Sequence, residues 1–142
     1  MKKKGFTLIE LMVVIVIMGI LAAVAVSKLF AMIAKSKAAE VGPVAGSYLH
    51  RQDVYIAEKL EIGDFDAIGF DIPPSTVFTY SETYTAMTKE IWTATPKAGK
   101  LSECSSDTWT VTSEIKSSRG KHIAATNCTK LTPNFTAIGS GS

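Results

Sequence analysis

The chain has 142 residues, of which 46% are hydrophobic and 20% charged, and its formal net charge is +2. Fifteen basic residues nearly balance 13 acidic ones, and three of the basic residues are Lys2, Lys3 and Lys4. The positive excess therefore belongs to the N-terminus, and charge alone gives no support for a nucleic-acid-binding face. The motifs HExxH, GxSxG, CxxC and the phosphate-binding loop are absent, and neither His50 nor His122 lies in a catalytic motif. These absences predict a protein that is not an enzyme and uses no cofactor.

The first predicted element is a long apolar helix near the N-terminus. No charged or polar side chain occurs between Leu11 and Val26, and roughly 20 apolar residues suffice to span the hydrocarbon core of a membrane. The lysines before this run would hold the N-terminus in the cytoplasm. A secretory signal peptide cut after the small residues 23–25 is the competing interpretation. It is disfavoured because the apolar pattern continues past that point into Leu29 and Phe30.

Glu10 lies at the start of this apolar run, where a charged side chain is unfavourable and needs a compensating interaction. A charged side chain within a membrane helix costs about 2.5–3.5 kcal/mol at the centre and less near the end. One account is local, because Thr7 and Glu10 fit the S/T-x-x-E capping box, in which Glu10 reaches back to the Thr7 backbone N–H. An acid in the first helical turn also gains about 0.3–1 kcal/mol from the helix dipole. Helix capping by itself can therefore account for Glu10.

The string KKKGFTLIELMVVIVIMGILAAVAV, residues 2–26, closely resembles the N-terminus of type IV pilins and of the pseudopilins of type II secretion. The resemblance implies a class III signal peptide, in which a prepilin peptidase removes a basic leader, residues 1–5. Cleavage then falls between Gly5 and Phe6, and Phe6 becomes N-methylated. The resemblance also implies an assembly role for Glu10, which would neutralise the new Phe6 amine of a neighbouring subunit.

The same resemblance implies a function. The chain is expected to be the structural subunit of a type IV pilus, polymerised through residues 6–28 into an extracellular filament for adhesion, motility or DNA uptake. The alternative is a minor tip pilin or a type II secretion pseudopilin with a binding role. The implied partners are further copies of the chain in a helical homopolymer, the prepilin peptidase, the assembly platform and its ATPase, and a surface or DNA ligand. The implied location is the bacterial inner membrane for the precursor and the extracellular pilus after assembly.

Residues 29–62 are predicted to continue the helix in amphipathic form. Apolar residues recur at helical spacing while lysines interrupt the run, which is typical of a helix with one buried side. Gly42-Pro43 predicts a bend, because proline inside a helix removes a hydrogen bond and usually kinks it. The helix is expected to end around residues 61–63.

Residues 63–142 are predicted to form a globular β-rich domain. Residues 64–74 indicate a loop whose aspartates, Asp64, Asp66 and Asp71, favour turn and capping roles over calcium binding, because the EF-hand spacing is missing. Alternating segments predict strands at residues 76–81, 90–97, 107–117 and 120–127. A small antiparallel sheet packed on the C-terminal half of the helix, an α+β fold, is the economical arrangement. Trp92 and Trp109 are expected in its core, with an exposed aromatic patch as the alternative.

The two cysteines, Cys104 and Cys128, admit two interpretations. A disulfide between them would stabilise a small domain by roughly 3 kcal/mol in the chain-entropy model. Two buried free thiols would suit a cytosolic protein instead. The export segment at the N-terminus favours the disulfide, and the resemblance to type IV pilins, many of which carry a C-terminal disulfide loop, points the same way.

Overall fold

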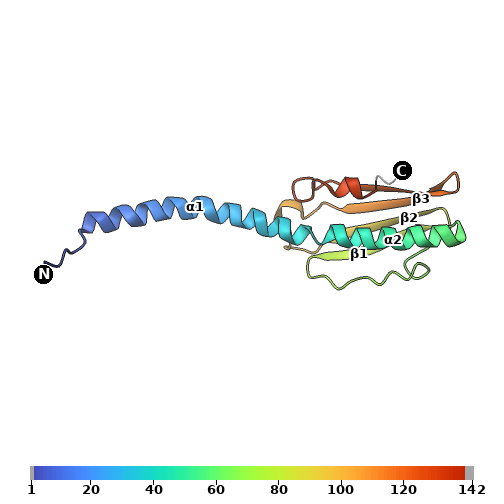
Figure 1. Ribbon diagram of the computed structural model, residues 1–142, viewed down its shortest axis with the longest axis horizontal. Helices are drawn as coiled ribbons and strands as arrows, with labels where there is room; N and C mark the ends of the chain where they lie inside the picture. The colour runs from blue at the N-terminus through green and yellow to red at the C-terminus, as the bar shows by residue number, and fades with distance from the viewer. Residues whose placement is uncertain (1, 140–142) are drawn as a thin grey trace. The chain divides into compact units, whose positions relative to one another are not determined.

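The computed structural model describes residues 2–139 and contains two long helices, four strands and two short 3-10 helices (Figure 1). In chain order these are α1 (Leu8–Ala38), α2 (Val41–Lys59), β1 (Phe78–Thr85), β2 (Lys89–Pro96), η1 (Ser102–Cys104), β3 (Trp109–Lys116), β4 (Arg119–Thr126) and η2 (Phe135–Gly139). The predicted α+β class is confirmed. The chain divides between Ile33 and Ala34 into two compact units.

The first unit consists of the N-terminal segment and most of α1. Its side chains from Leu8 to Phe30 are all exposed, although nearly all of them are apolar. Ser27 lies within the apolar stretch, and its hydroxyl donates a hydrogen bond to the Val24 carbonyl at 2.9 Å, which satisfies it locally. By length and composition, the run from Leu8 to Lys59 qualifies as one helix able to cross a membrane.

The helix is interrupted slightly earlier than the sequence predicted. Turn residues Ala39 and Glu40 separate α1 from α2, so Gly42-Pro43 lies inside the first turn of α2 rather than at the break. The reason is that Pro43 has no N–H for the carbonyl of Ala39, and its ring crowds that carbonyl, so the disturbance falls one turn upstream. The Tyr80 hydroxyl fastens the break to β1 by donating to Glu40 Oε1 at 2.8 Å.

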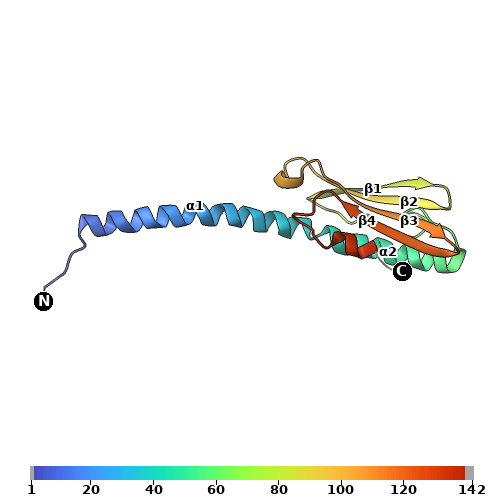
Figure 2. The ribbon, with the colours of Figure 1, turned by 90° about the horizontal axis from the view of Figure 1, so that it is seen from above.

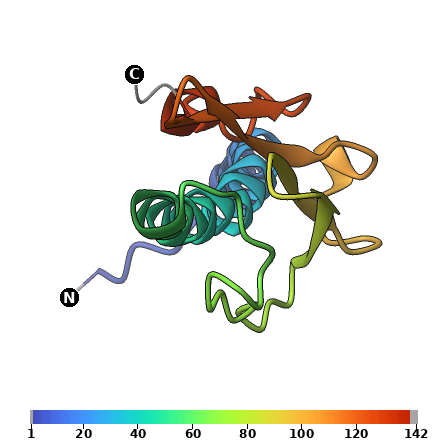
Figure 3. The same ribbon diagram turned by 90° about the vertical axis from the view of Figure 1, so that its right-hand side faces the viewer.

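The C-terminal end of α2 also differs from the prediction. The helix ends at Lys59, about a turn short of the expected residues 61–63, because Leu60 adopts the left-handed conformation with φ 58° and ψ 30°. Its N–H still bonds to the Ile56 carbonyl at 2.9 Å and closes the last turn. The connection that follows is long and irregular before it reaches β1 (Figure 3). Within it, Asp64 Oδ1 accepts the Ala67 N–H at 2.8 Å, which is the turn role that the sequence favoured.

The four strands form one antiparallel sheet in the order β1-β2-β3-β4. Three strands lie within two residues of their predicted bounds, but β1 runs on to Thr85 instead of ending at residue 81. Its polar second half joins the ladder because the register pairs Tyr84 with Glu90 and Thr85 with Lys89. Helix α2 packs along one face of the sheet, next to β3 and β4 (Figure 2).

The core of the second unit lies between α2 and this face of the sheet. Trp92 and Trp109 are completely buried, so their predicted core placement is confirmed and the exposed-patch alternative is wrong. The Trp92 ring stacks on Tyr80 with centroids 5.5 Å apart and on Tyr48 of α2 at 6.2 Å. Gly120 of β4 has no side chain to keep the helix away, because a Cβ there would lie 2.7 Å from Ile56 Cδ1. Aromatic packing and one close approach therefore hold α2 on the sheet.

Candidate functional site

The segment Gly5 to Glu10 lies just before and at the start of α1. Helix formation begins at Leu8, so Gly5 and Phe6 precede it in irregular backbone, and Phe6 is 93% exposed. The Thr7 N–H donates to Glu10 Oε2 at 2.9 Å, and the Glu10 N–H donates to Thr7 Oγ1 at 3.4 Å. This is the reciprocal capping box that the sequence predicted. Within one chain, the Glu10 carboxylate is therefore engaged by the helix start.

Gly5 has no structural task in this fold. Within the described part of the chain, no atom outside its immediate neighbours lies within 4 Å of the position that a Cβ would take, so a larger residue would fit. If glycine is required at this position, the requirement comes from a molecule that binds the segment, not from the fold.

Helix α1 carries an extended exposed apolar surface. Soluble proteins rarely leave contiguous apolar surface of this extent in water. The side chains that form it include Leu8, Leu11, Ile15, Met18, Ile20, Leu21, Phe30 and Met32, each more than half exposed. Lipid or other protein chains must therefore cover α1.

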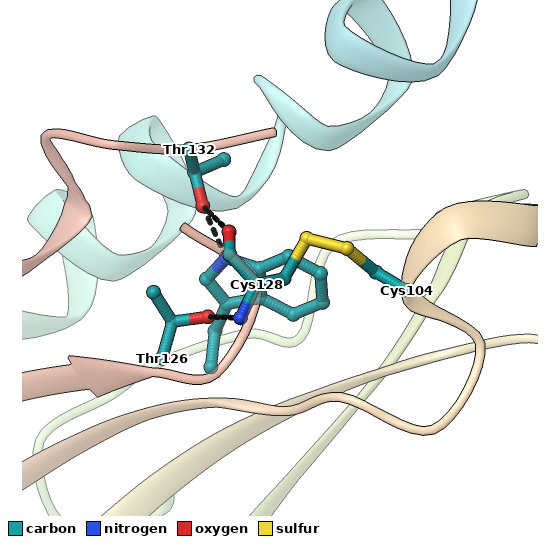
Figure 4. Close-up of a disulfide and its surroundings, with 5 residues drawn as sticks. Cys104, Thr126, Cys128 and Thr132 are labelled. Atoms are coloured by element: carbon teal, nitrogen blue, oxygen red, sulfur yellow. Dashed lines mark hydrogen bonds between the residues drawn. A yellow bond between two sulfur atoms is a disulfide. The ribbon is translucent and has the colours of Figure 1, made fainter. Parts of the chain in front are cut away.

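The disulfide between Cys104 and Cys128 is present and links η1 to the segment after β4 (Figure 4). The Cys128 N–H donates to Thr126 Oγ1 at 3.1 Å, and the Thr132 hydroxyl donates to the Cys128 carbonyl at 3.2 Å. The same Thr132 oxygen accepts the Trp109 indole N–H at 2.6 Å. Asp107 lies close to both sulfurs, but the sulfurs are bonded to each other and are not available as metal ligands.

A row of buried polar residues crosses the inner face of the sheet, and the sequence did not reveal it. The register places Glu90 of β2 opposite Ser113 of β3, and Ser113 opposite His122 of β4. Glu90 and Ser113 are completely buried, and His122 is 9% exposed. The alternation of β2 was the available signal, because Glu90 has the same parity as Trp92 and must face the core.

Hydrogen bonds connect this row to α2. Tyr48 donates from its hydroxyl to Glu90 Oε2 at 3.1 Å and lies 3.0 Å from Ser113 Oγ. Ser113 Oγ lies 2.8 Å from His122 Nδ1, and His122 Nε2 lies 2.9 Å from Asp53 Oδ1. Since the Asp53 side chain is 63% exposed, the chain of contacts leads from the core to the surface.

Comparison with known proteins bears on the N-terminal segment first. Residues 1–26 match the family model described as the prokaryotic N-terminal methylation motif. The chain is 40% identical over 70 residues to the type IV major pilin protein PilA of Myxococcus xanthus (strain DK1622). The N-terminal half of the chain therefore resembles type IV pilins. The aligned region covers 49% of this chain but 32% of that relative, so the match spans about a third of its length. No solved structure matches the chain.

The chain brings together residues that resemble a catalytic triad, and their burial decides their role. Ser113, His122 and Asp53 follow one another in hydrogen-bonding distance, although the sequence showed no base near any serine. Ser113 has no exposed surface and also contacts the Tyr48 hydroxyl, so no substrate reaches its oxygen. The arrangement joins α2 to the sheet. His50, by contrast, is exposed on α2.

Burial raises the pKa values of two groups where α2 meets this row. Burial raises the pKa of Glu90 to about 8, and the neighbouring Glu82 carboxyl adds to the rise. Burial also raises the pKa of the Tyr48 hydroxyl far above its ordinary value, with the charge of Glu90 contributing. Tyr48 therefore remains a neutral donor at any physiological pH, while Glu90 holds a proton near neutrality.

Proposed function

We propose that this chain is the structural subunit of a type IV pilus, cut between Gly5 and Phe6 and polymerised through α1. The observation that carries the proposal is the extended, exposed apolar surface of α1 with an acid at its start. Such a surface is stable only inside a membrane or among other apolar helices. A filament subunit needs both environments, first as a precursor in the inner membrane and then in the core of a pilus.

The N-terminal geometry supports processing at Gly5. The segment before Leu8 is irregular, so a membrane-embedded prepilin peptidase can bind it without unwinding α1. Lys2, Lys3 and Lys4 would leave with the leader, and the new chain would begin at Phe6 with a cationic amine. N-methylation keeps that charge while it changes the group.

The new amine gives Glu10 a second partner. Two opposite charges 4 Å apart attract by about 4 kcal/mol at an effective dielectric of 20, whereas an unpaired buried charge is strongly destabilising. In a single chain, the capping box with Thr7 engages Glu10. On assembly, we propose that the Phe6 amine of a neighbouring subunit replaces this local contact. One charge pair for each subunit would then set the register of the packed helices.

The leader lysines, the second unit and the disulfide are consistent with the same sequence of membrane insertion and assembly. The lysines would retain the N-terminus in the cytoplasm, and residues 34–142 would lie outside the cytoplasm, where a disulfide persists. Extraction from the membrane would require an assembly platform and an ATPase, because the apolar α1 does not leave lipid spontaneously. In the assembled pilus, the polar second unit faces the solvent and is the surface for a host, DNA or neighbouring cell.

The test begins with the mass of the protein purified from sheared surface filaments. A mature chain that begins with methylated Phe6 is expected, and high abundance in the sheared fraction distinguishes a major subunit from a minor tip pilin. A chain that still begins at Met1, or one that is trimmed after Ala25, contradicts the proposal. Glu10→Gln should leave cleavage and membrane insertion intact but reduce filament yield at least about tenfold, since each 1.4 kcal/mol is tenfold. Glu58→Gln, on the exposed side of α2, is the matched control.

A further inference from the structure

Glu90 is the only fully buried carboxylic acid among residues 2–139, and it lies on the inner face of β2 beneath α2. Its Oε2 atom accepts hydrogen bonds from the Tyr48 hydroxyl at 3.1 Å and from the Gln52 amide. Its Oε1 atom is equally buried and has no hydrogen-bond partner within the described residues. Burying a polar oxygen without a partner is destabilising. The chemical group next to Glu90 therefore determines how much this burial costs.

That group is a second carboxyl, on the adjacent strand. Glu82 of β1 pairs with Trp92, so it is the diagonal neighbour of Glu90 on the same face of the sheet. The two carboxyls lie within hydrogen-bonding reach of each other. Glu82 is itself held in place, because its Oε2 accepts the Phe65 N–H at 2.7 Å. Each acid thus has one oxygen fixed by N–H or O–H donors while the two side chains meet.

Glu82 is exposed to solvent, whereas Glu90 is completely buried, so a negative charge on Glu90 is disfavoured both by burial and by its acidic neighbour, and a proton or a cation would relieve it. A calcium ion takes 6–8 oxygen ligands, but the Glu90 carboxyl is surrounded by the hydrogen-bond donors of Tyr48 and Gln52. The metal-type cluster that the described residues form lies elsewhere, at the disulfide. One proton, held by one acid and accepted by the other, satisfies the geometry.

We propose that Glu82 and Glu90 share one proton, and that this proton makes the contact between α2 and the sheet depend on pH. With the proton in place, a neutral acid donates to a carboxylate. After its loss, two adjacent negative charges remain, one of them without access to water. Hydration of Glu90 then requires water to enter between α2 and β2, which separates Tyr48 and Gln52 from the sheet. Acid therefore tightens the contact between α2 and the sheet, and alkali loosens it.

Other titratable groups around the pair do not replace the proton. The titratable groups that the packed elements supply around it are Tyr48 and Asp53 of α2, Tyr84 of β1 and His122 of β4. Tyr48 stays neutral because burial raises its pKa, and the pKa of Tyr84 is also raised, by desolvation first and then by nearby acids. His122 contacts Asp53 and Ser113, not the acid pair.

The direction of the pH effect follows from linkage. Burial, with Glu82, raises the pKa of Glu90 from 4.5 to about 8 in the folded chain. Because the folded pKa exceeds the unfolded one, the stabilisation is complete below about pH 4.5 and is lost as the pH rises to about 8. Between about pH 6 and about pH 9 the equilibrium for opening changes on the order of 100-fold.

The test is amide hydrogen exchange of the full chain in detergent micelles, corrected for the intrinsic rate at each pH. Protection of the α2 amides should fall on the order of 100-fold from about pH 6 to about pH 9. In Glu90→Gln the side-chain amide replaces the proton as donor to Glu82, so the protection should become nearly independent of pH. Glu58→Gln, an exposed acid on the same helix, should behave like the unmodified chain.

Three results would overturn the proposal. The first is an equal pH dependence in Glu90→Gln and the unmodified chain. The second is recovery of protection at about pH 9 on addition of calcium, which would identify a cation site. The third covers a variant that fails to fold: in the unmodified chain, the carboxyl carbon of Glu90, followed by nuclear magnetic resonance, should titrate near pH 8, and titration at the ordinary value of 4.5 would exclude a shared proton.

Discussion

Reduction of the disulfide should lower the melting temperature of the second unit by about 15 °C. The bond joins Cys104 and Cys128 across a sequence separation of 24. In the chain-entropy model, a loop of this length restrains the unfolded chain by about 3.5 kcal/mol. At about 4 °C for each kcal/mol in a domain of roughly 100 residues, this free energy corresponds to the stated shift.

The assay is thermal unfolding of the full chain in detergent micelles, followed by tryptophan fluorescence. Trp92 and Trp109 are both completely buried, so their emission reports on the second unit alone. The oxidised and reduced forms of the unmodified chain are compared first, because reduction keeps the sulfur atoms in the core. The double variant with Cys104→Ala and Cys128→Ala is the control, and its melting temperature should not respond to the reductant.

A difference below about 3 °C between the oxidised and reduced chains would refute the loop-closure argument. It would mean that the unfolded state is already restrained by other contacts. A response of the double variant to the reductant would show that the reductant acts on something other than this bond.

Two further substitutions test the packing around the C-terminal segment. Thr132→Val leaves the buried Trp109 N–H without its acceptor and should lower the free energy of unfolding, measured by urea denaturation, by about 1–3 kcal/mol. Thr132→Ser keeps the hydroxyl, so its free energy of unfolding should stay close to that of the unmodified chain. Gly139→Ala would place a Cβ 2.4 Å from the backbone nitrogen of Ala124 and should lower the urea midpoint. Gly46→Ala on α2 meets open space and should raise that midpoint by a stabilisation of about 0.5–1 kcal/mol; the opposite order of the two midpoints would contradict both readings.

Local patterns in the sequence were sufficient for the elements themselves. The apolar run and the capping box at Thr7 and Glu10 depend on residues within one or two helical turns, and the structure contains both. The helix break was placed a few residues late, because Pro43 disturbs the carbonyl four residues before it rather than its own position. The end of β1 was missed because its last residues are held by pairing with β2, which depends on the partner strand.

The polar row under α2 could not be predicted in this way. Glu90, Ser113 and His122 come from three strands, and they meet only because the hairpin registers align them. Register depends on turn geometry and on the whole apolar face, so no short window of sequence contains the information. The proposed pair between Glu10 and a Phe6 amine lies still further out of reach, since it joins two chains.

The position of η2 has a consequence for how copies of this protein avoid each other. Gly139 lies against the backbone of β4, so close that a Cβ would lie 2.9 Å from the Ile123 carbonyl carbon and 3.0 Å from the His122 oxygen. An unprotected strand edge is a template for pairing with another sheet, and here the final 3-10 turn covers one. Truncation before Phe135 would therefore uncover β4 and favour sheet-to-sheet aggregation.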